Sequence, residues 1–428
     1  MAGLPFIRKF YVDYRPVSGL QDNSPVEFNV PGDSPHLVSW KDTMLCAEWH
    51  LEKDNQPAAQ STGKTVVPVN LIHHSMWSHV DVHVQHQTLH SVNDYAYRAY
   101  LESLIGLSNT STLNTEGWYP DEPGEFENYK SSTQKNTEAT TWYSGKATYE
   151  DFKSAGLYRA PNLNTGFTNR LAMVESGKKK LTVGPLHIDL CQQDQPLLPG
   201  VDVSLTLWPS PPSFYLLSDL AHTETAKWRL KIDRVWLRVC YMQLTEKDAH
   251  RVEQQLTKKV SYPLQSVVMK SYTIPAQNKT FEIDGVFQGK LPSVVLAVIL
   301  PNTAYRGDTL RNPFYFGDNN LTQATVYVDG VATPHAPLSL EENNLNDAYF
   351  DLLKFSGGRG PSLKGYEEGS MVLCFDLAGH QESSPRPGHT RMVLDFKTPD
   401  DAPRTLLLYA IVPQTLHFDR HRQLTVTE

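Results

Sequence analysis

The segment VDVSLTLW (residues 201–208) has the pattern that decides the fold class. Its first seven residues alternate strictly between apolar side chains at odd positions and polar side chains at even positions. Successive side chains of a β-strand point to opposite faces, so one face of this segment is wholly apolar. The segment is therefore predicted to be a strand with one face buried and the other exposed.

Similar apolar alternation recurs along the whole chain. The segments are separated by proline, glycine, asparagine and aspartate, which favour turns between antiparallel strands. These predicted strands cover residues 44–51, 66–72, 80–88, 181–190, 281–287, 294–300, 325–328, 371–377, 391–397 and 406–412. The chain is therefore predicted to be mainly β.

One long strand-like segment, residues 228–244, changes its alternation midway. Apolar residues occupy even positions up to Ile232 and odd positions from Val235 onward. An extra residue in one strand of an antiparallel pair restores the alternation, so we predict a β-bulge near Asp233.

Three segments are predicted to be helices, at residues 93–106, 245–259 and 346–355. Asn93 is a candidate cap for the first helix, and Thr245 with Asp248 resembles a capping box at the start of the second. The first and third helices each follow a strand, open with Asn-Asp, are rich in tyrosine and leucine, and end at glycine. This resemblance between them indicates an internal duplication.

The length of 428 residues predicts two or three domains at ~150 residues each. We place the division at the second helix, which connects two β units. The first domain then covers residues 1–245, including an N-terminal arm and a loop insertion at residues 107–168 that lacks a sustained period. The second covers residues 246–428 and begins with the connecting helix.

Composition excludes several classes of protein. Apolar residues make up 40% of the chain and charged residues 20%, so it is expected to be globular. A net charge of −8 disfavours specific nucleic-acid binding, and no apolar run is long enough for a transmembrane helix. The start of the sequence lacks a secretory signal, which predicts synthesis in the cytosol. The four isolated cysteines are predicted to be buried and reduced: Cys46, Cys191, Cys240 and Cys374.

Histidines are concentrated in one segment. Six of the sixteen lie at positions 73, 74, 79, 83, 86 and 90. On a strand, His79, Asp81 and His83 share a face, and His-x-Asp begins the facial triad of non-haem iron enzymes. A triad would need a distal histidine, for which His187 is a candidate. The alternative is a polar strand face whose histidines form hydrogen bonds or meet a neighbouring subunit.

A set of motifs extends over residues 65–425. In the first half they are VPVN (67–70), HSMWSHVDV (74–82), YAYRAYLE (95–102), Trp118-Tyr119, GPLHIDL (184–190), Gln193-Asp194 and LPGVD (198–202). In the second half they are NPFYF (312–316), YVDG (327–330), Gly369-Ser370, FDL (375–377) and FDR (418–420). Together and in this order, they resemble the double jelly-roll major capsid, or hexon, proteins of Polinton/Maverick elements, adintoviruses and adomaviruses.

The resemblance implies two tandem eight-stranded antiparallel jelly rolls with a few short helices. It implies a structural protein that is not an enzyme and has no cofactor or metal. Three chains would form a homotrimer with a pseudo-hexagonal outline, and such capsomers would tile an icosahedral shell of a double-stranded DNA virus. The expected partners are neighbouring capsomers, a single jelly-roll penton protein and other minor capsid proteins. The expected location is the virion capsid, with assembly in the host cytoplasm or nucleus.

Four aromatic residues are candidates for the outer end of the capsomer or for a subunit interface: Trp118, Tyr119, Trp142 and Tyr143. Two other functions remain open beside the capsid role. One is a metal-dependent jelly-roll enzyme that uses His79, Asp81 and His187. The other is a glycan-binding β-sandwich that uses the aromatic-rich insertion.

Overall fold

A computed structural model of the chain provides the architecture. It describes residues 6–58, 66–106, 112–127, 164–174, 177–218, 220, 222–255, 259–287, 291–317, 320–340, 345–377 and 388–427. No helix within these ranges is long and apolar enough to cross a membrane.

The first half of the chain forms a sandwich of two main sheets. One sheet has the strand order β1-β11-β3-β4, with β8 also paired to β3, and the other has the order β2-β9-β6-β7. The strands are β1 (Phe6–Tyr14), β2 (Val26–Val30), β3 (Leu37–Lys53), β4 (Gln56–Pro57), β6 (Trp77–Val84), β7 (Gln87–Val92), β8 (Lys180–Pro185), β9 (Val203–Pro209) and β11 (Trp228–Leu244). A separate pair joins β5 (Val66–Pro68) to β10 (Leu216–Ser218).

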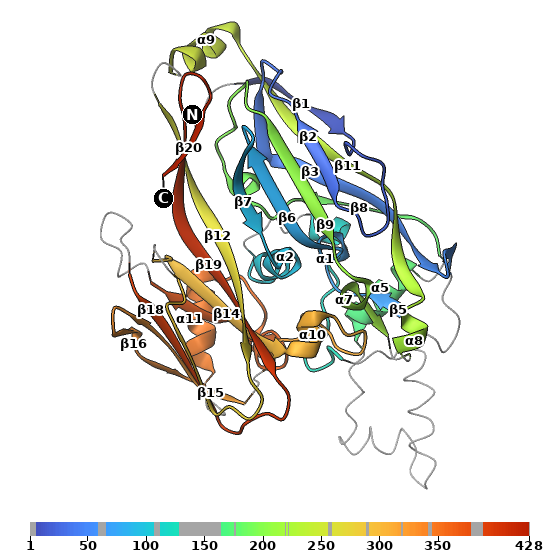
Figure 1. The fold of residues 1–428 in the computed structure, drawn as a ribbon, viewed down its shortest axis with the longest axis vertical. Coiled ribbons are helices and arrows are strands. Elements are labelled where there is room, and N and C mark those ends of the chain that lie inside the picture. The colour runs from blue at the N-terminus through green and yellow to red at the C-terminus, as the bar shows by residue number, and fades with distance from the viewer. Residues whose placement is uncertain are drawn as a thin grey trace, which may run out of the picture.

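The second half forms another two-sheet sandwich. Its sheets have the orders β12-β19-β14-β17, with β20 paired to β19, and β13-β18-β15-β16. The strands are β12 (Val260–Ile274), β13 (Thr280–Asp284), β14 (Val294–Pro301), β15 (Leu321–Val328), β16 (Val331–Ser339), β17 (Leu373–Asp376), β18 (Thr390–Phe396), β19 (Arg404–Phe418) and β20 (Leu424–Thr427). The two sandwiches lie side by side in Figure 1.

The two sandwiches have the same topology. Leaving out the short β4, β5, β10 and β20, the strands of each half, counted in chain order, lie 1-8-3-6 in one sheet and 2-7-4-5 in the other. Every named strand pair is antiparallel. Two four-stranded sheets with this crossing order make a jelly roll. The predicted pair of eight-stranded jelly rolls is confirmed.

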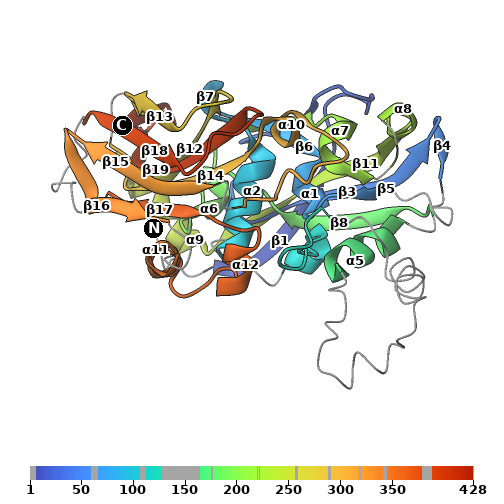
Figure 2. The same ribbon diagram turned by 90° about the horizontal axis from the view of Figure 1, so that it is seen from below.

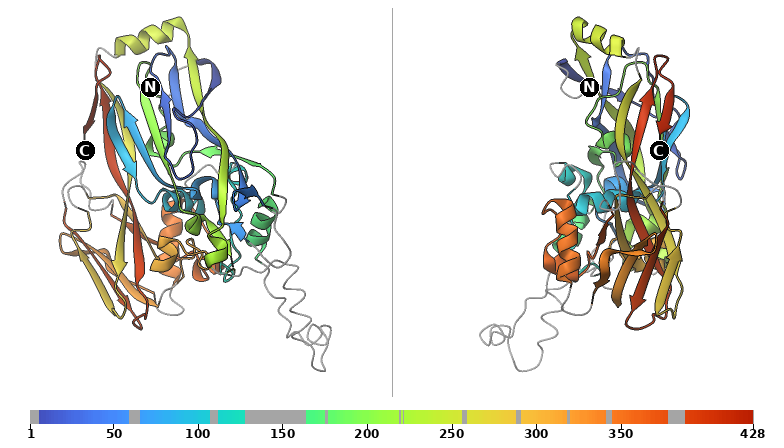
Figure 3. Two further views of the ribbon diagram at one scale, coloured as in Figure 1. Left: turned by 45° about the vertical axis from the view of Figure 1, so that its right-hand side comes forward. Right: turned by 90° about the vertical axis from the view of Figure 1, so that its left-hand side faces the viewer.

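Helices connect and flank the strands. They are α1 (Ile72–Ser75), α2 (Tyr95–Leu104), the 3₁₀ turn η1 (Leu113–Glu116), α5 (Thr165–Val174), α6 (Asp189–Gln192), α7 (Pro212–Tyr215), α8 (His222–Thr225), α9 (Glu246–Gln255), α10 (Asn302–Arg306), α11 (Asn346–Ser356) and α12 (Leu363–Glu367). Helix α9 connects the two jelly rolls at one end of the molecule (Figure 1). Helices α5, α11 and α12 lie along one side (Figure 2), and α11 projects from the strands in the side view of Figure 3.

Local predictions from the alternation and the caps are mostly confirmed. In β9, Val203, Leu205 and Leu207 are buried, and the register of β11 against β3 shifts between Ile232 and Arg234, as the bulge requires. All three predicted helices form, and all four cysteines are buried free thiols. The cap of α2 is a correction, because its N-cap is Asp94, not Asn93, and no side chain caps the helix.

Several strand boundaries and part of the predicted loop need correction. The segment 80–88 is not one strand, because β6 ends at Val84 and β7 begins at Gln87 after a turn, and the segment 281–287 leaves the strand after Asp284. The segment 66–72 leaves the strand after Pro68 and enters α1, and the segment 181–190 leaves it after Pro185 and reaches α6. In the predicted insertion, residues 112–127 and 164–168 include buried side chains, among them Phe126 and Phe167. These segments pack on the core without a regular period, so apolar periodicity did not reveal them.

Aromatic rings connect the two jelly rolls. Phe314, from the loop that follows α10 in the second half, stacks on Tyr100 of α2 with ring centroids 4.0 Å apart and planes 1° from parallel. Both side chains are buried. Offset-stacked rings of this kind add to the free energy gained from burial alone.

We predict that Phe314→Ala lowers the free energy of unfolding by about 3–5 kcal/mol, because it leaves a cavity between the jelly rolls. Phe350→Ala is the matched control, since Phe350 on α11 is 66% exposed and should change stability by less than about 0.5 kcal/mol. Denaturant titration measures both. Equal effects of the two substitutions would contradict a packing role for Phe314.

Candidate functional site

A charged pair is buried on helix α2. Arg98 and Glu102 lie one turn apart on a face that packs inside the molecule, and both are almost completely buried. Arg98 Nε donates to Glu102 Oε1 at 2.9 Å, and Arg98 Nη2 lies 2.8 Å from Asp189 Oδ1. Because a buried charge is costly unless it is paired, these three side chains depend on one another.

The second jelly roll donates hydrogen bonds to these carboxylates. The hydroxyl of Tyr409 on β19 donates to Glu102 Oε1 at 3.1 Å. The backbone N–H of Val267 on β12 donates to Asp189 Oδ1 at 3.3 Å. Polar groups of both halves therefore meet in one buried network, which also includes His90 Nδ1 at 2.6 Å from Asp189 Oδ2.

The network keeps its carboxylates ionised. Burial by itself would raise the pKa of Glu102, but the charge of Arg98 and the hydrogen bond from His187 outweigh it and lower the pKa to about 2. The pKa of Asp189 is also lowered, because His90 and Arg98 outweigh its desolvation. We call this buried network between the two jelly rolls the junction. At neutral pH it therefore contains two ionised carboxylates beside one guanidinium.

Histidines extend the network within the first jelly roll. His187 Nδ1 lies 2.6 Å from Glu102 Oε2. His74 on α1 makes two contacts, from Nδ1 to the Tyr95 hydroxyl and from Nε2 to Glu116 Oε2, both at 2.9 Å. Desolvation lowers the pKa of His74, so the ring is neutral at pH 7 and donates its Nε2–H to Glu116.

Three of these side chains have the donor types of a metal site. The ligand atoms of His74, Glu116 and His187 all lie within 4.8 Å of one another. Among the residues that the structure describes, this is the one group of three or more histidine, cysteine or acidic side chains close enough together to hold a metal ion. It contains neither His79 nor Asp81.

The metal triad of His79, Asp81 and His187 that the sequence suggested is wrong. His79 Nε2 and Asp81 Oδ1 bond directly to each other at 2.8 Å on the partly exposed face of β6. The Trp208 indole N–H also donates to Asp81, at 3.0 Å. His187 is instead buried beside Glu102, since the chain turns away from the strand after Pro185.

The six histidines of residues 73–90 lie on different structural elements. His73 and His74 lie in α1 and are buried, His79 and His83 lie on β6, His86 lies in the turn that follows, and His90 lies on β7. The prediction of one polar strand face holds only for the β6 histidines.

The structure describes two of the four aromatic residues that were candidates for an interface. Trp118 is half-buried, with its ring 5.3 Å from that of Tyr100, and Tyr119 is half-buried with its backbone N–H donating to Asn70 Oδ1. Trp142 and Tyr143 lie outside the described residues. An interface role for all four stays a prediction.

Sequence reasoning missed the charged members of the buried network. Arg98 and Glu102 lie in a segment whose pattern predicts only a helix. One signal was present, because the two charges are spaced i, i+4 within the tyrosine-rich YAYRAYLESL of α2. Glu116 gave no signal, since it lies in the segment interpreted as a surface loop.

We predict that Glu102→Gln lowers the free energy of unfolding by about 3–5 kcal/mol, because it leaves Arg98 under-compensated in the core. The matched control is Glu282→Gln, which removes an exposed carboxylate 3.0 Å from Arg391 and should cost less than about 1 kcal/mol. Denaturant unfolding of both variants tests this. A cost for Glu102→Gln as small as the control would show that the buried charges are not coupled.

Comparison with known proteins gives a consistent result for the fold. No family model and no curated protein sequence matches the chain. Solved structures do match over nearly the whole chain. A structure of the Sputnik virophage has a TM-score of 0.61 at 9% identity and covers 99% of this chain and 88% of that chain. A structure of the PBCV-1 virus capsid has a TM-score of 0.56 at 11% identity, and the match covers 98% of this chain and 97% of that chain.

The mavirus major capsid protein has a TM-score of 0.55 at 11% identity, covering 100% of this chain and 91% of that chain. At such low identity the likeness concerns the fold. It agrees with the strand order of both sandwiches, which the chain repeats without a missing strand. The chain therefore has the double jelly-roll fold of viral major capsid proteins.

Proposed function

We propose that this chain is the major capsid protein of an icosahedral double-stranded DNA virus. The observation that carries the proposal is the match of both jelly rolls, over nearly full length, to viral capsid proteins. In this role the protein acts by contact with copies of itself and catalyses no reaction. Three chains form a homotrimer with a pseudo-hexagonal outline, because each chain contributes two similar jelly rolls.

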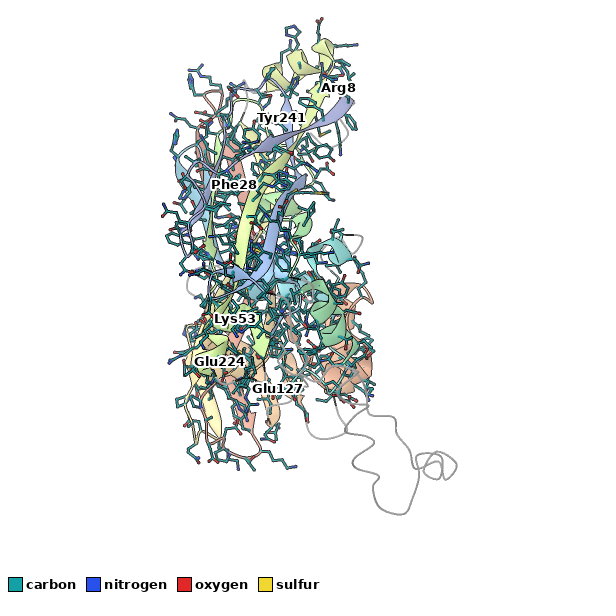
Figure 4. The ribbon with its side chains drawn as sticks, turned by 90° about the vertical axis from the view of Figure 1, so that its right-hand side faces the viewer. Arg8, Phe28, Lys53, Glu127, Glu224 and Tyr241 are labelled. Atoms are coloured by element: carbon teal, nitrogen blue, oxygen red, sulfur yellow. The ribbon has the colours of Figure 1, made fainter. Side chains whose placement is uncertain are left out.

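The outer edge of the first jelly roll supports self-association. Strand β1 pairs with β11 on one side and ends its sheet. Its inner residues Phe10 and Tyr14 pack on Tyr241, whereas Ile7 and Tyr11 are 59% and 51% exposed. In Figure 4, Arg8 of β1 lies at the outer edge of the molecule. An exposed apolar edge strand favours pairing or packing with another chain.

In this proposal the first jelly roll comprises residues 1–245 and the second residues 246–428, since β11 ends at Leu244 and β12 begins at Val260. The partners are neighbouring capsomers, a penton protein and minor capsid proteins, and the location is the virion, after synthesis in the host cytosol and assembly in cytoplasm or nucleus. Trp118 and Tyr119 contribute less to contacts than β1, because a single chain already half-buries them.

Native mass spectrometry at micromolar concentration tests the proposal. We expect a trimer of the 48.3 kDa chain, and a capsomer with a hexagonal outline in electron micrographs. A protein that stays monomeric and forms no shells with its partners would overturn the capsid assignment.

The double substitution Ile7→Asp and Tyr11→Asp should weaken trimer formation by roughly 30-fold or more, because central interface residues contribute about 2 kcal/mol or more. Val331→Asp is the matched control, since Val331 on β16 is 58% exposed and lies in the other jelly roll. The control should remain trimeric. Trimers of unchanged stability in the double variant would exclude β1 as the contact surface.

A further inference from the structure

Three separate elements bring potential metal ligands to one buried point. His74 comes from α1, Glu116 from η1, and His187 from the segment between β8 and α6. All three side chains are at least 97% buried. Their ligand atoms lie within 4.8 Å of one another. Each of these groups loses its hydration on burial, so the core must compensate it with hydrogen bonds or a bound ion.

His187 directs an unused nitrogen into this cluster. Its Nδ1 lies 2.6 Å from Glu102 Oε2, so the Nδ1–H donates to that carboxylate. In the tautomer that carries its proton on Nδ1, the ring has a lone pair on Nε2. This atom is buried, and none of the residues that the structure describes provides it with a hydrogen-bond partner. A buried acceptor without a partner costs about 1–3 kcal/mol.

His74 faces the same point. Its ring lies perpendicular to that of His187, at 89° with centroids 4.6 Å apart. Its Nε2 is 2.9 Å from Glu116 Oε2, and its Nδ1 is 2.9 Å from the Tyr95 hydroxyl. The Tyr95 hydroxyl also accepts the backbone N–H of His187 at 3.2 Å, which links the two histidines.

We propose that His74 Nε2, His187 Nε2 and the Glu116 carboxylate bind a divalent transition-metal ion, with Zn²⁺ as the best match. Two imidazoles with one carboxylate are a common Zn²⁺ ligand set. On binding, His74 moves its proton from Nε2 to Nδ1, where the Tyr95 oxygen accepts it. No net proton is released from this ring.

The surroundings match those of known metal sites. Metal-bound histidines usually donate their other N–H to a carboxylate or another oxygen, and here Glu102 serves His187 while Tyr95 serves His74. Tetrahedral Zn²⁺ with bonds near 2.0–2.1 Å places its ligands roughly 3.3 Å apart. His74 and Glu116 already lie closer than this, and the ligand atoms of the cluster lie within 4.8 Å of one another, so His187 moves inward by at most about 1.5 Å.

A cavity also adjoins the cluster on one side. Glu102, Thr112 and His187 line this cavity of about 430 Å³, together with Tyr409 of β19 from the second jelly roll. Of the three proposed ligands, His187 borders it. The bound ion would join α1, η1 and the β8–α6 segment next to the network that connects the jelly rolls. This inference does not depend on the proposed capsid function.

Metal analysis of the full-length protein, purified without chelator, tests the site. We expect about one Zn²⁺ per chain and, after removal and reloading with zinc, a rise in melting temperature of roughly 5 °C. Adding Co²⁺ to the stripped protein should produce the visible absorption of tetrahedral Co²⁺. Less than a tenth of an ion per chain, with no Co²⁺ absorption, would mean that a buried water fills the cluster and would overturn the proposal.

Glu116→Gln is the decisive variant, because the amide oxygen still accepts the His74 hydrogen bond but is a poor metal ligand. We expect zinc affinity to fall at least 100-fold. His83→Gln, which changes a partly exposed histidine on β6, is the control and should bind zinc as the unmodified chain does. Equal zinc affinity of the two variants would refute the assignment. If Glu116→Gln does not fold, the Co²⁺ spectrum of the unmodified chain decides.

Discussion

The structure depends on a pair of opposite charges buried on one helix. Arg98 and Glu102 of α2 are removed from water between the jelly rolls, and each compensates the other. Because Glu102 also accepts from Tyr409 and His187, one carboxylate connects both halves of the chain and the histidine cluster. Hydrogen-bonded buried charges allow few arrangements of the two jelly rolls, because a lost partner leaves a charge uncompensated in the core.

The two jelly rolls share a topology but differ in their interiors. Both place a helix after the fifth strand, α2 in the first and α11 in the second. Helix α2 contributes Arg98 and Glu102 to the junction, while α11 leaves Phe350 exposed to solvent. The corresponding helix is thus buried in one half and partly exposed at the surface in the other.

The surface and the junction have separate tasks. The junction contains ionised groups, and separating them from their partners costs much free energy. They therefore hold the two jelly rolls in one arrangement. Strand β1 instead offers apolar side chains and an open sheet edge, which are suited to contacts with further chains. The proposed role as a shell subunit would use both features, since such a subunit needs rigid internal geometry and edges that meet neighbours.

The sequence alone determined the mainly β class, the bulge near Asp233, the helices α2, α9 and α11 and the buried cysteines, but not the equally long α5. These features follow from local periodicity, which sets the burial of successive side chains whatever the rest of the chain does. The junction and the histidine cluster depended on the tertiary structure. His74, Glu116 and His187 are far apart in sequence. The first two lie in single helical turns and His187 lies between β8 and α6, so no period marks them. Only the folding of three elements around α2 brings them together, and it separates His187 from His79 and Asp81.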